Sequence, residues 1–73
     1  MKEYEGKDLY SIGIHIPEKS RYNYNFYRLP NGEEVLLVND DDGWNDVFLV
    51  DGDKQTLVGG QYDDGGFMFG SFT

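Results

Sequence analysis

The sequence predicts a small all-β protein, an antiparallel meander of five or six short strands. Apolar residues alternate at period two, clusters of Gly, Asn and Asp interrupt the chain at short intervals, and no ten-residue window has a helical period. The 73 residues form one small acidic β domain, 1–73. Connections this short join antiparallel neighbours. We expect the sheet to curl, as far as a small barrel, or to dimerise by packing against a second copy.

The expected strands are separated by turn residues. Between Tyr10 and Ile16 every second residue is Tyr or Ile, which predicts a strand that Pro17 ends. Asn31-Gly32 favours a type I′ turn, because both central positions of that turn need positive φ. Gly59-Gly60 indicates a bulge or bend, and at most one helical turn is expected, near residues 2–9. In chain order, the expected strands are 9–16, 22–29, 34–39, 44–51, 54–61 and 67–72.

A chain of this size buries a small core and is marginally stable alone. It has no Cys, which excludes disulfides and thiolate metal sites and is typical of a reducing compartment. Aromatic residues make up 16% of the chain and supply the packing, either in the core or at a homodimer interface. No targeting segment or membrane-length apolar run is present, so we expect a cytoplasmic protein.

Negative charge is concentrated in the second half of the chain. Residues 1–32 hold five basic and four acidic side chains, whereas residues 33–73 hold ten acidic side chains and one lysine. The two halves therefore carry +1 and −9, which together give the net charge of −8. Such a field repels nucleic acid and anionic membranes and attracts basic protein surfaces.

The residues do not form a recognisable catalytic set, so we expect no enzymatic activity and no cofactor. Ser11 and His15 would share a face of one strand, but a rise of about 3.3 Å per residue places them roughly 13 Å apart, too far for a hydrogen bond. A catalytic pair of carboxylates needs a substrate cleft, which a chain this short rarely forms. Gly59-Gly60 and Gly65-Gly66 open no helix, and two aspartates precede Gly65-Gly66, so these pairs do not resemble phosphate loops.

The acidic turn 39–43 does not fit the EF-hand pattern. Aligning Gly43 as the loop glycine places Val38 at the first ligand position and Leu49 at the last. We expect no metal site, and a β-module that binds calcium through Asp40, Asp42 and Asp63, or another ligand, stays open as an alternative. Asp and Gly are also ordinary turn formers.

The segment 21–28 interleaves aromatic residues with two arginines, as single-strand-binding platforms do. The field of the chain has the wrong sign for direct nucleic-acid binding. Tyr22, Tyr24 and Phe26 are expected to share one face, either as core residues or as an aromatic patch for protein contact.

Function is therefore expected to reside in a surface that binds protein. The chain is similar in composition, and in composition only, to the short, acidic, Cys-free inhibitors of nucleases, glycosylases and CRISPR effectors that many phages encode. This similarity implies an anti-CRISPR-like inhibitor, a DNA mimic whose carboxylates imitate phosphates and occupy a basic, nucleic-acid-binding protein. The residues expected to bind the partner are Glu33, Glu34, Asp40, Asp41, Asp42, Trp44, Asp46, Tyr62, Asp63 and Asp64. The alternative is a structural or assembly subunit that docks through a β edge or an aromatic face.

Overall fold

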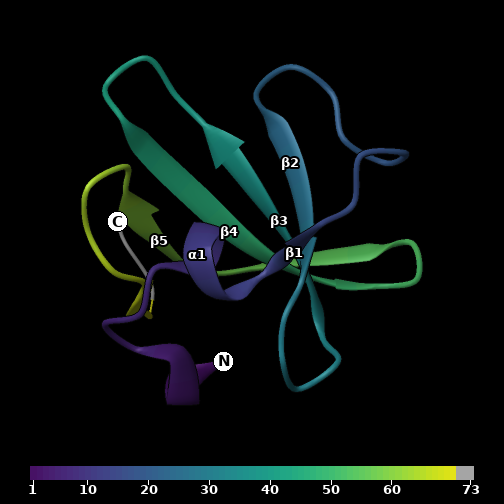
Figure 1. Ribbon diagram of the computed structural model, residues 1–73, viewed down its shortest axis with the longest axis horizontal. Coiled ribbons are helices and arrows are strands. Elements are labelled where there is room, and N and C mark those ends of the chain that lie inside the picture. The colour runs from purple at the N-terminus through teal and green to yellow at the C-terminus, as the bar shows by residue number, and fades with distance from the viewer. Residues whose placement is uncertain (71–73) are drawn as a thin grey trace.

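The computed structural model describes residues 1–70 as one six-stranded antiparallel sheet with a short helix packed on it (Figure 1). The strands lie side by side in chain order, so the predicted meander is confirmed. The sheet is neither closed nor strongly curled, and the expected small barrel is wrong. The strands are β1 Ile14–His15, β2 Tyr24–Arg28, β3 Glu34–Asn39, β4 Trp44–Asp51, β5 Lys54–Tyr62 and β6 Met68–Phe69.

The first predicted strand, 9–16, is wrong over most of its length. Leu9–Ile12 forms the α-helix α1, and only Ile14–His15 pairs with β2 as strand β1. Asp8 caps the helix, since its carboxylate accepts a hydrogen bond from the backbone N–H of Tyr10 at 3.0 Å. Capping by Asp8 and burial of Leu9 stabilise the helical turn over the strand that the alternating pattern favours. A further turn, of 3-10 type, spans Lys2–Tyr4 within the predicted region.

The other predicted boundaries are close to the observed ones. Strands β3 and β4 begin and end at the predicted residues, and β4 lies between β3 and β5 as a central strand. Strand β2 starts two residues later than predicted, because Arg21 and Tyr24 close a tight turn in which Asn23 has a φ of 68°. Strand β5 extends one residue further, and the predicted last strand is limited to Met68–Phe69, with its final two residues outside the described part.

The turn at Asn31-Gly32 is not of type I′. Gly32 has a φ of 91°, but Asn31 does not have a positive φ. Instead, the N–H of Gly32 donates to the carbonyl of Leu29, and the N–H of Leu29 donates to the carbonyl of Glu33. Pro30 therefore occupies the second turn position, where its fixed φ is favourable, and lengthens the loop beyond two residues.

The predicted irregularity in β5 is present. Val47 pairs with Gly59 while Phe48 pairs with Leu57, so Val58 is the extra residue of a β-bulge. Gly59 has a φ of 158° and lies against the backbone carbonyl of Met68, which leaves no room for a side chain. The bulge thus adjusts β5 to pair with both neighbours.

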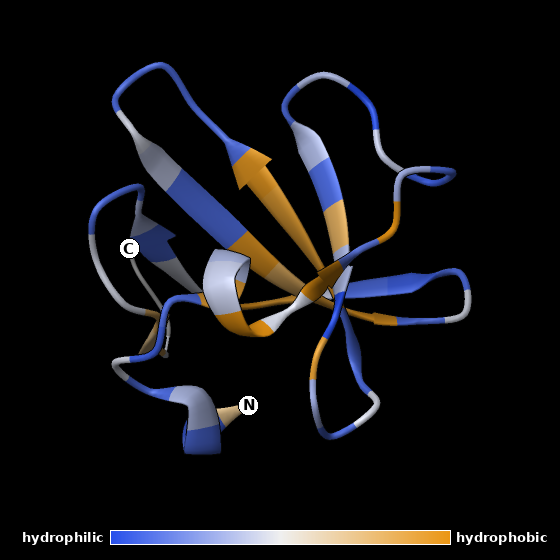
Figure 2. Cartoon of the chain, in the orientation of Figure 1, coloured by the Kyte–Doolittle hydropathy of each residue, from blue (hydrophilic) through white to orange (hydrophobic). Residues whose placement is uncertain are grey.

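The two faces of the sheet differ. The inner face is covered by α1 and the N-terminal turn, and Figure 2 shows hydrophobic segments of α1, β3 and β4 gathered at the centre of the molecule. No helix within residues 1–70 is long and apolar enough to span a membrane. The buried core cluster comprises Tyr4, Leu9, Leu29, Val35, Leu37, Val47 and Phe67.

Candidate protein-binding surfaces

Two loops bring five of the predicted acidic residues together at one end of the sheet. The loop after β3 and the loop after β5 lie on the same side of the molecule (Figure 1), and the N–H of Asp63 joins them by donating to the carbonyl of Gly43 at 2.8 Å. This grouping follows from the meander, in which β3 and β5 run in the same direction, so both strands finish at the same end of the sheet. The acidic end consists of Asp40, Asp41, Asp42, Asp63 and Asp64.

Two of these carboxylates stabilise the loops themselves. Asp40 Oδ1 accepts hydrogen bonds from the backbone N–H groups of Asp42 at 2.9 Å and Trp44 at 3.1 Å. Asp63 Oδ1 accepts from Asn45 Nδ2 at 2.9 Å and from Asn39 Nδ2 at 3.3 Å. By contrast, the exposed side chains of Asp41, Asp42 and Asp64 make no hydrogen bond or ion pair within residues 1–70. Their negative charge therefore faces solvent without a neighbouring cation.

Aromatic side chains stand beside the acidic end. Trp44 and Tyr62 are cross-strand partners with ring centroids 4.9 Å apart in an edge-to-face arrangement. The indole N–H of Trp44 donates to Asp46 Oδ1 at 2.8 Å, and the ring lies over Gly60, where a side chain would overlap it. Tyr62 is 52% exposed. The structure thus brings together three further predicted residues, Trp44, Asp46 and Tyr62, next to the acidic loops.

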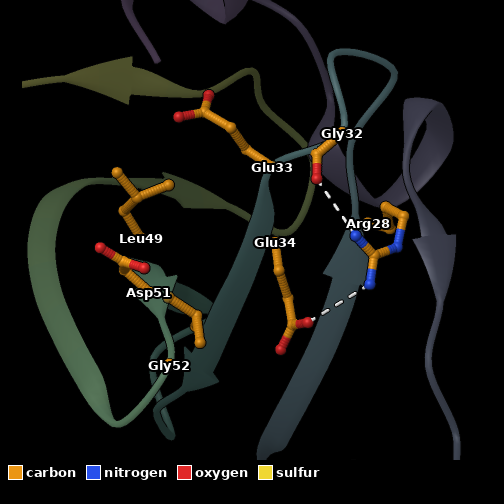
Figure 3. A pocket seen from close by; sticks show the side chains of 8 residues that line it. Arg28, Gly32, Glu33, Glu34, Leu49, Asp51 and Gly52 are labelled. Atoms are coloured by element: carbon orange, nitrogen blue, oxygen red, sulfur yellow. Dashed lines mark hydrogen bonds and ion pairs between the residues drawn. The ribbon is translucent and has the colours of Figure 1, made fainter.

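Glu33 and Glu34 lie at the opposite end of β3, so they do not join this surface. The five residue steps of β3 separate Glu34 from Asn39 by roughly 17 Å. Figure 3 shows Arg28 directed at both Glu34 and the carbonyl of Gly32. Glu34 also accepts an ion pair from Lys19 at 2.8 Å, and its side chain is only 10% exposed.

The expected partner-binding residues therefore do not form one continuous surface. The predicted carboxylates divide between two ends of the sheet because β3 and its hairpins run the length of the molecule. At the end of the sheet that holds Glu34, a hollow of about 370 Å³ lies between the β2–β3 turn and the β4–β5 turn. There, Glu34 is neutralised by two cations and serves the fold.

The second surface is the outer face, the side of the sheet opposite α1. Strand pairing places Phe26, Leu36, Phe48 and Leu57 in one row that crosses four strands. A second row, nearer the acidic end, holds Tyr24, Val38 and Asp46, and a third holds Arg28, Glu34, Val50 and Gln55. The pair Trp44 and Tyr62 forms the next row on the same side, so the outer face consists of thirteen side chains and adjoins the acidic end. Tyr24 is 51% exposed and Leu57 46% exposed, whereas Leu36 is 4% exposed, so of the two places expected for Tyr24 the core is excluded.

A buried polar network on the inner face escaped the sequence prediction. Asn45 and Gln61 are fully buried, and each bonds to α1 or its cap. Asn45 Oδ1 accepts from Tyr10 Oη at 2.6 Å, and Gln61 Nε2 donates to the Asp8 carboxylate at 3.0 Å. The hydrogen bond from Gln61 lowers the pKa of Asp8, while burial raises the pKa of Tyr10 to about 12. The only sequence signal was an amide at an inward position of each of two apolar strands.

The structure gives no support to the calcium alternative. Within residues 1–70, no three His, Asp or Glu side chains are placed to hold a metal ion. Asp40 and Asp63 instead accept hydrogen bonds from the protein.

Ser11 lies on α1 and donates to Asp8, so it does not share a strand with His15. No protein-family model, curated protein or solved structure matches this chain.

Proposed function

We propose that this protein binds a basic, nucleic-acid-processing protein through its acidic end and inhibits it by occupying the nucleic-acid site. The observation that supports this function is the meeting of two acidic loops, held together by the bond from Asp63 to Gly43. Asp41, Asp42 and Asp64 offer carboxylates that no cation of residues 1–70 neutralises. Lys and Arg side chains of a partner can therefore pair with them.

Long-range charge adds to the attraction. The net charge of −8 steers a basic partner toward the molecule and accelerates association. Tyr62, half exposed beside the carboxylates, supplies an aromatic surface on which an arginine can stack. The proposed contact residues are now Asp40, Asp41, Asp42, Asp46, Tyr62, Asp63 and Asp64, with Trp44 as the packing support of Tyr62.

A charge-reversal pair tests this function. The double variant Asp41→Lys with Asp42→Lys should lose a basic partner that the native chain captures from lysate, and should no longer displace nucleic acid from that partner. The matched control is Asp51→Lys with Asp53→Lys, which makes the same charge change at the exposed β4–β5 turn at the other end. Binding should also weaken steeply between about 50 and 500 mM salt, since the contact is electrostatic. Equal loss in both double variants would reduce the effect to net charge and refute the acidic end as the site.

A second candidate function rests on a different observation. The row Phe26, Leu36, Phe48 and Leu57 crosses the outer face, where Leu57 is 46% exposed and Leu36 is 4% exposed. An assembly subunit that docks through this face would depend on apolar contact, and its binding would respond little to salt. Leu57→Lys should then abolish docking while the Asp41 and Asp42 reversals leave it unchanged.

A further inference from the structure

We infer that Asn31 is a site of spontaneous deamidation and that the folded β2–β3 turn suppresses this reaction. The inference is independent of the acidic end. Asn31 is the only asparagine of the chain that precedes a glycine. Because Gly32 has no side chain to shield its backbone nitrogen, that nitrogen can reach the Asn31 side chain when the turn is open.

The reaction needs no reagent other than water. The backbone nitrogen of Gly32 gives up its proton and bonds to the side-chain carbonyl carbon of Asn31. The bond from this carbon to Nδ2 breaks, so ammonia leaves and a cyclic succinimide remains. Water then opens the ring at either carbonyl and gives aspartate or isoaspartate. Both residues are exposed, and a Cβ added at Gly32 would meet no atom within 4 Å, so water reaches the turn.

Hydrogen bonds engage both reacting groups in the folded chain. The N–H of Gly32 donates to the carbonyl of Leu29 at 2.9 Å, so its proton is held within the turn. Asn31 Oδ1 accepts from the N–H of Glu33 at 2.9 Å, and Nδ2 donates to Glu33 Oε1 at 2.6 Å and to Glu3 Oε2 at 3.1 Å. These bonds hold the side chain and the turn backbone in one arrangement, so ring closure requires the turn to open.

The N-terminal turn takes part in this protection. The backbone N–H of Asn31 donates to the phenol oxygen of Tyr4 at 2.9 Å, and Tyr4 is only 6% exposed. Hydrogen bonds from the N-terminal ammonium, from its own backbone N–H and from Asn31 lower the pKa of Glu3 to about 2, so Glu3 accepts as a carboxylate at neutral pH. Loss of the Asn31 amide would place a third carboxylate between Glu3 and Glu33 and make both contacts repulsive. Deamidation should therefore release the N-terminal turn from the loop.

The deamidation rate of the full chain tests the inference. Tandem mass spectrometry over a time course at mildly alkaline pH measures the mass gain at Asn31, once in buffer and once in urea that unfolds the chain. The native chain should react at least about tenfold more slowly in buffer than in urea, since the hydrogen bonds of the turn must break first. Equal rates in the two solutions, or no reaction at Asn31 in urea, would overturn the inference.

The double variant Glu3→Ala with Glu33→Ala identifies the protecting contacts. For each variant the rate in urea is divided by the rate in buffer, which cancels the effect of the substitutions on the unfolded chain. Removal of both acceptors of Nδ2 should lower this ratio at least about threefold. The matched control, Asp41→Ala with Asp42→Ala, removes the same charge at the other end of the sheet and should keep the native ratio. Circular dichroism confirms that both variants remain folded, and an equal ratio in the two would refute protection by these carboxylates.

Asn31→Asp tests the consequence of the reaction. The new carboxylate faces Glu3 and Glu33, so the urea midpoint should fall below that of the native chain. Asn23→Asp adds the same charge at the turn before β2, where no side-chain hydrogen bond of Asn23 is lost, and should change the midpoint less. Equal midpoints for the two variants would show that the Asn31 amide does not hold the N-terminal turn.

Discussion

Tyr10 on α1 donates a 2.6 Å hydrogen bond from its phenol oxygen to Oδ1 of Asn45, a side chain on β4 that is completely buried. This bond joins residues 35 positions apart and attaches the helix to the sheet. Asn45 Oδ1 has a second donor, Asn39 Nδ2 at 2.9 Å, and its own Nδ2 donates to Asp63. The network therefore couples α1 to the loop that positions the acidic end.

Tyr10→Phe should lower the free energy of unfolding by about 1 kcal/mol, the usual net value of one hydrogen bond. The loss is limited because Asn39 still donates to Asn45. Urea denaturation monitored by circular dichroism measures the change. The control is Tyr22→Phe, which removes the same hydroxyl from a side chain that is 91% exposed and should leave stability unchanged.

Alkaline pH should destabilise the fold through Tyr10. Burial, followed by repulsion from the ionised phenol of Tyr27 at alkaline pH and from the carboxylates of Asp63 and Asp8, raises the pKa of Tyr10 from 10.0 to about 12. The neutral phenol is therefore favoured in the folded state, and its contribution is complete below pH 10 and lost as pH rises toward 12. Urea midpoints measured across this range should fall less steeply for Tyr10→Phe than for the native chain. Identical slopes would show that Tyr10 does not carry the effect.

Acidic pH should weaken the helix cap. The hydrogen bond from Gln61 and those from Ser11 and the helix backbone lower the pKa of Asp8 below its ordinary 3.8. Ionised Asp8 therefore contributes stability above pH 3.8, and this contribution is lost as pH falls through the lowered pKa. Asp8→Ala should cost about 1 kcal/mol at neutral pH and flatten the acid limb of the stability profile. Asp53→Ala, at an exposed turn position, should change neither.

Gly60→Ala should displace the indole of Trp44. A methyl group at residue 60 would overlap the ring, so the sheet must shift or the ring must turn away. We expect a loss of about 1–3 kcal/mol, as for other overpacked sites. Because Trp44 is the single tryptophan, its fluorescence reports the displacement directly. Gly65→Ala is the control, since its added methyl meets Tyr62 Cβ at an ordinary 3.7 Å.

The parts of the fold that the sequence predicted well depend on local signals. Strands β3 and β4 each hold a run of four apolar residues bounded by Gly- or Asp-rich turns, and their observed bounds match the predicted ones. The first segment shows why alternation alone can fail. Leu9 has its backbone N–H bound by Gln61 Oε1, 52 residues away, and no local pattern reveals that contact. The buried network of Asn45 and Gln61 was missed for the same reason, because its hydrogen bonds join residues that are far apart in the sequence.

The candidate site was predicted in composition but not in arrangement. The acidic loops after β3 and β5 could be identified from their residues. Antiparallel pairing of successive strands places both loops at the same end of the sheet. Glu34 belongs to the same acidic half of the sequence, yet it lies at the other end of β3 and pairs with Lys19 and Arg28. Glu34 was therefore wrongly grouped with the acidic end, because the grouping followed proximity along the chain.

The meander could be predicted from local signals, because short apolar segments joined by short turns pair as antiparallel neighbours. Which apolar residues form the inner core depends on the three-dimensional arrangement, because α1 packs against one side of the sheet and buries that side most completely. This arrangement also decided which carboxylates meet, since a carboxylate's neighbours are set by strand direction and length. The number of charges and their spacing along the chain do not give the distance between two carboxylates in the folded protein.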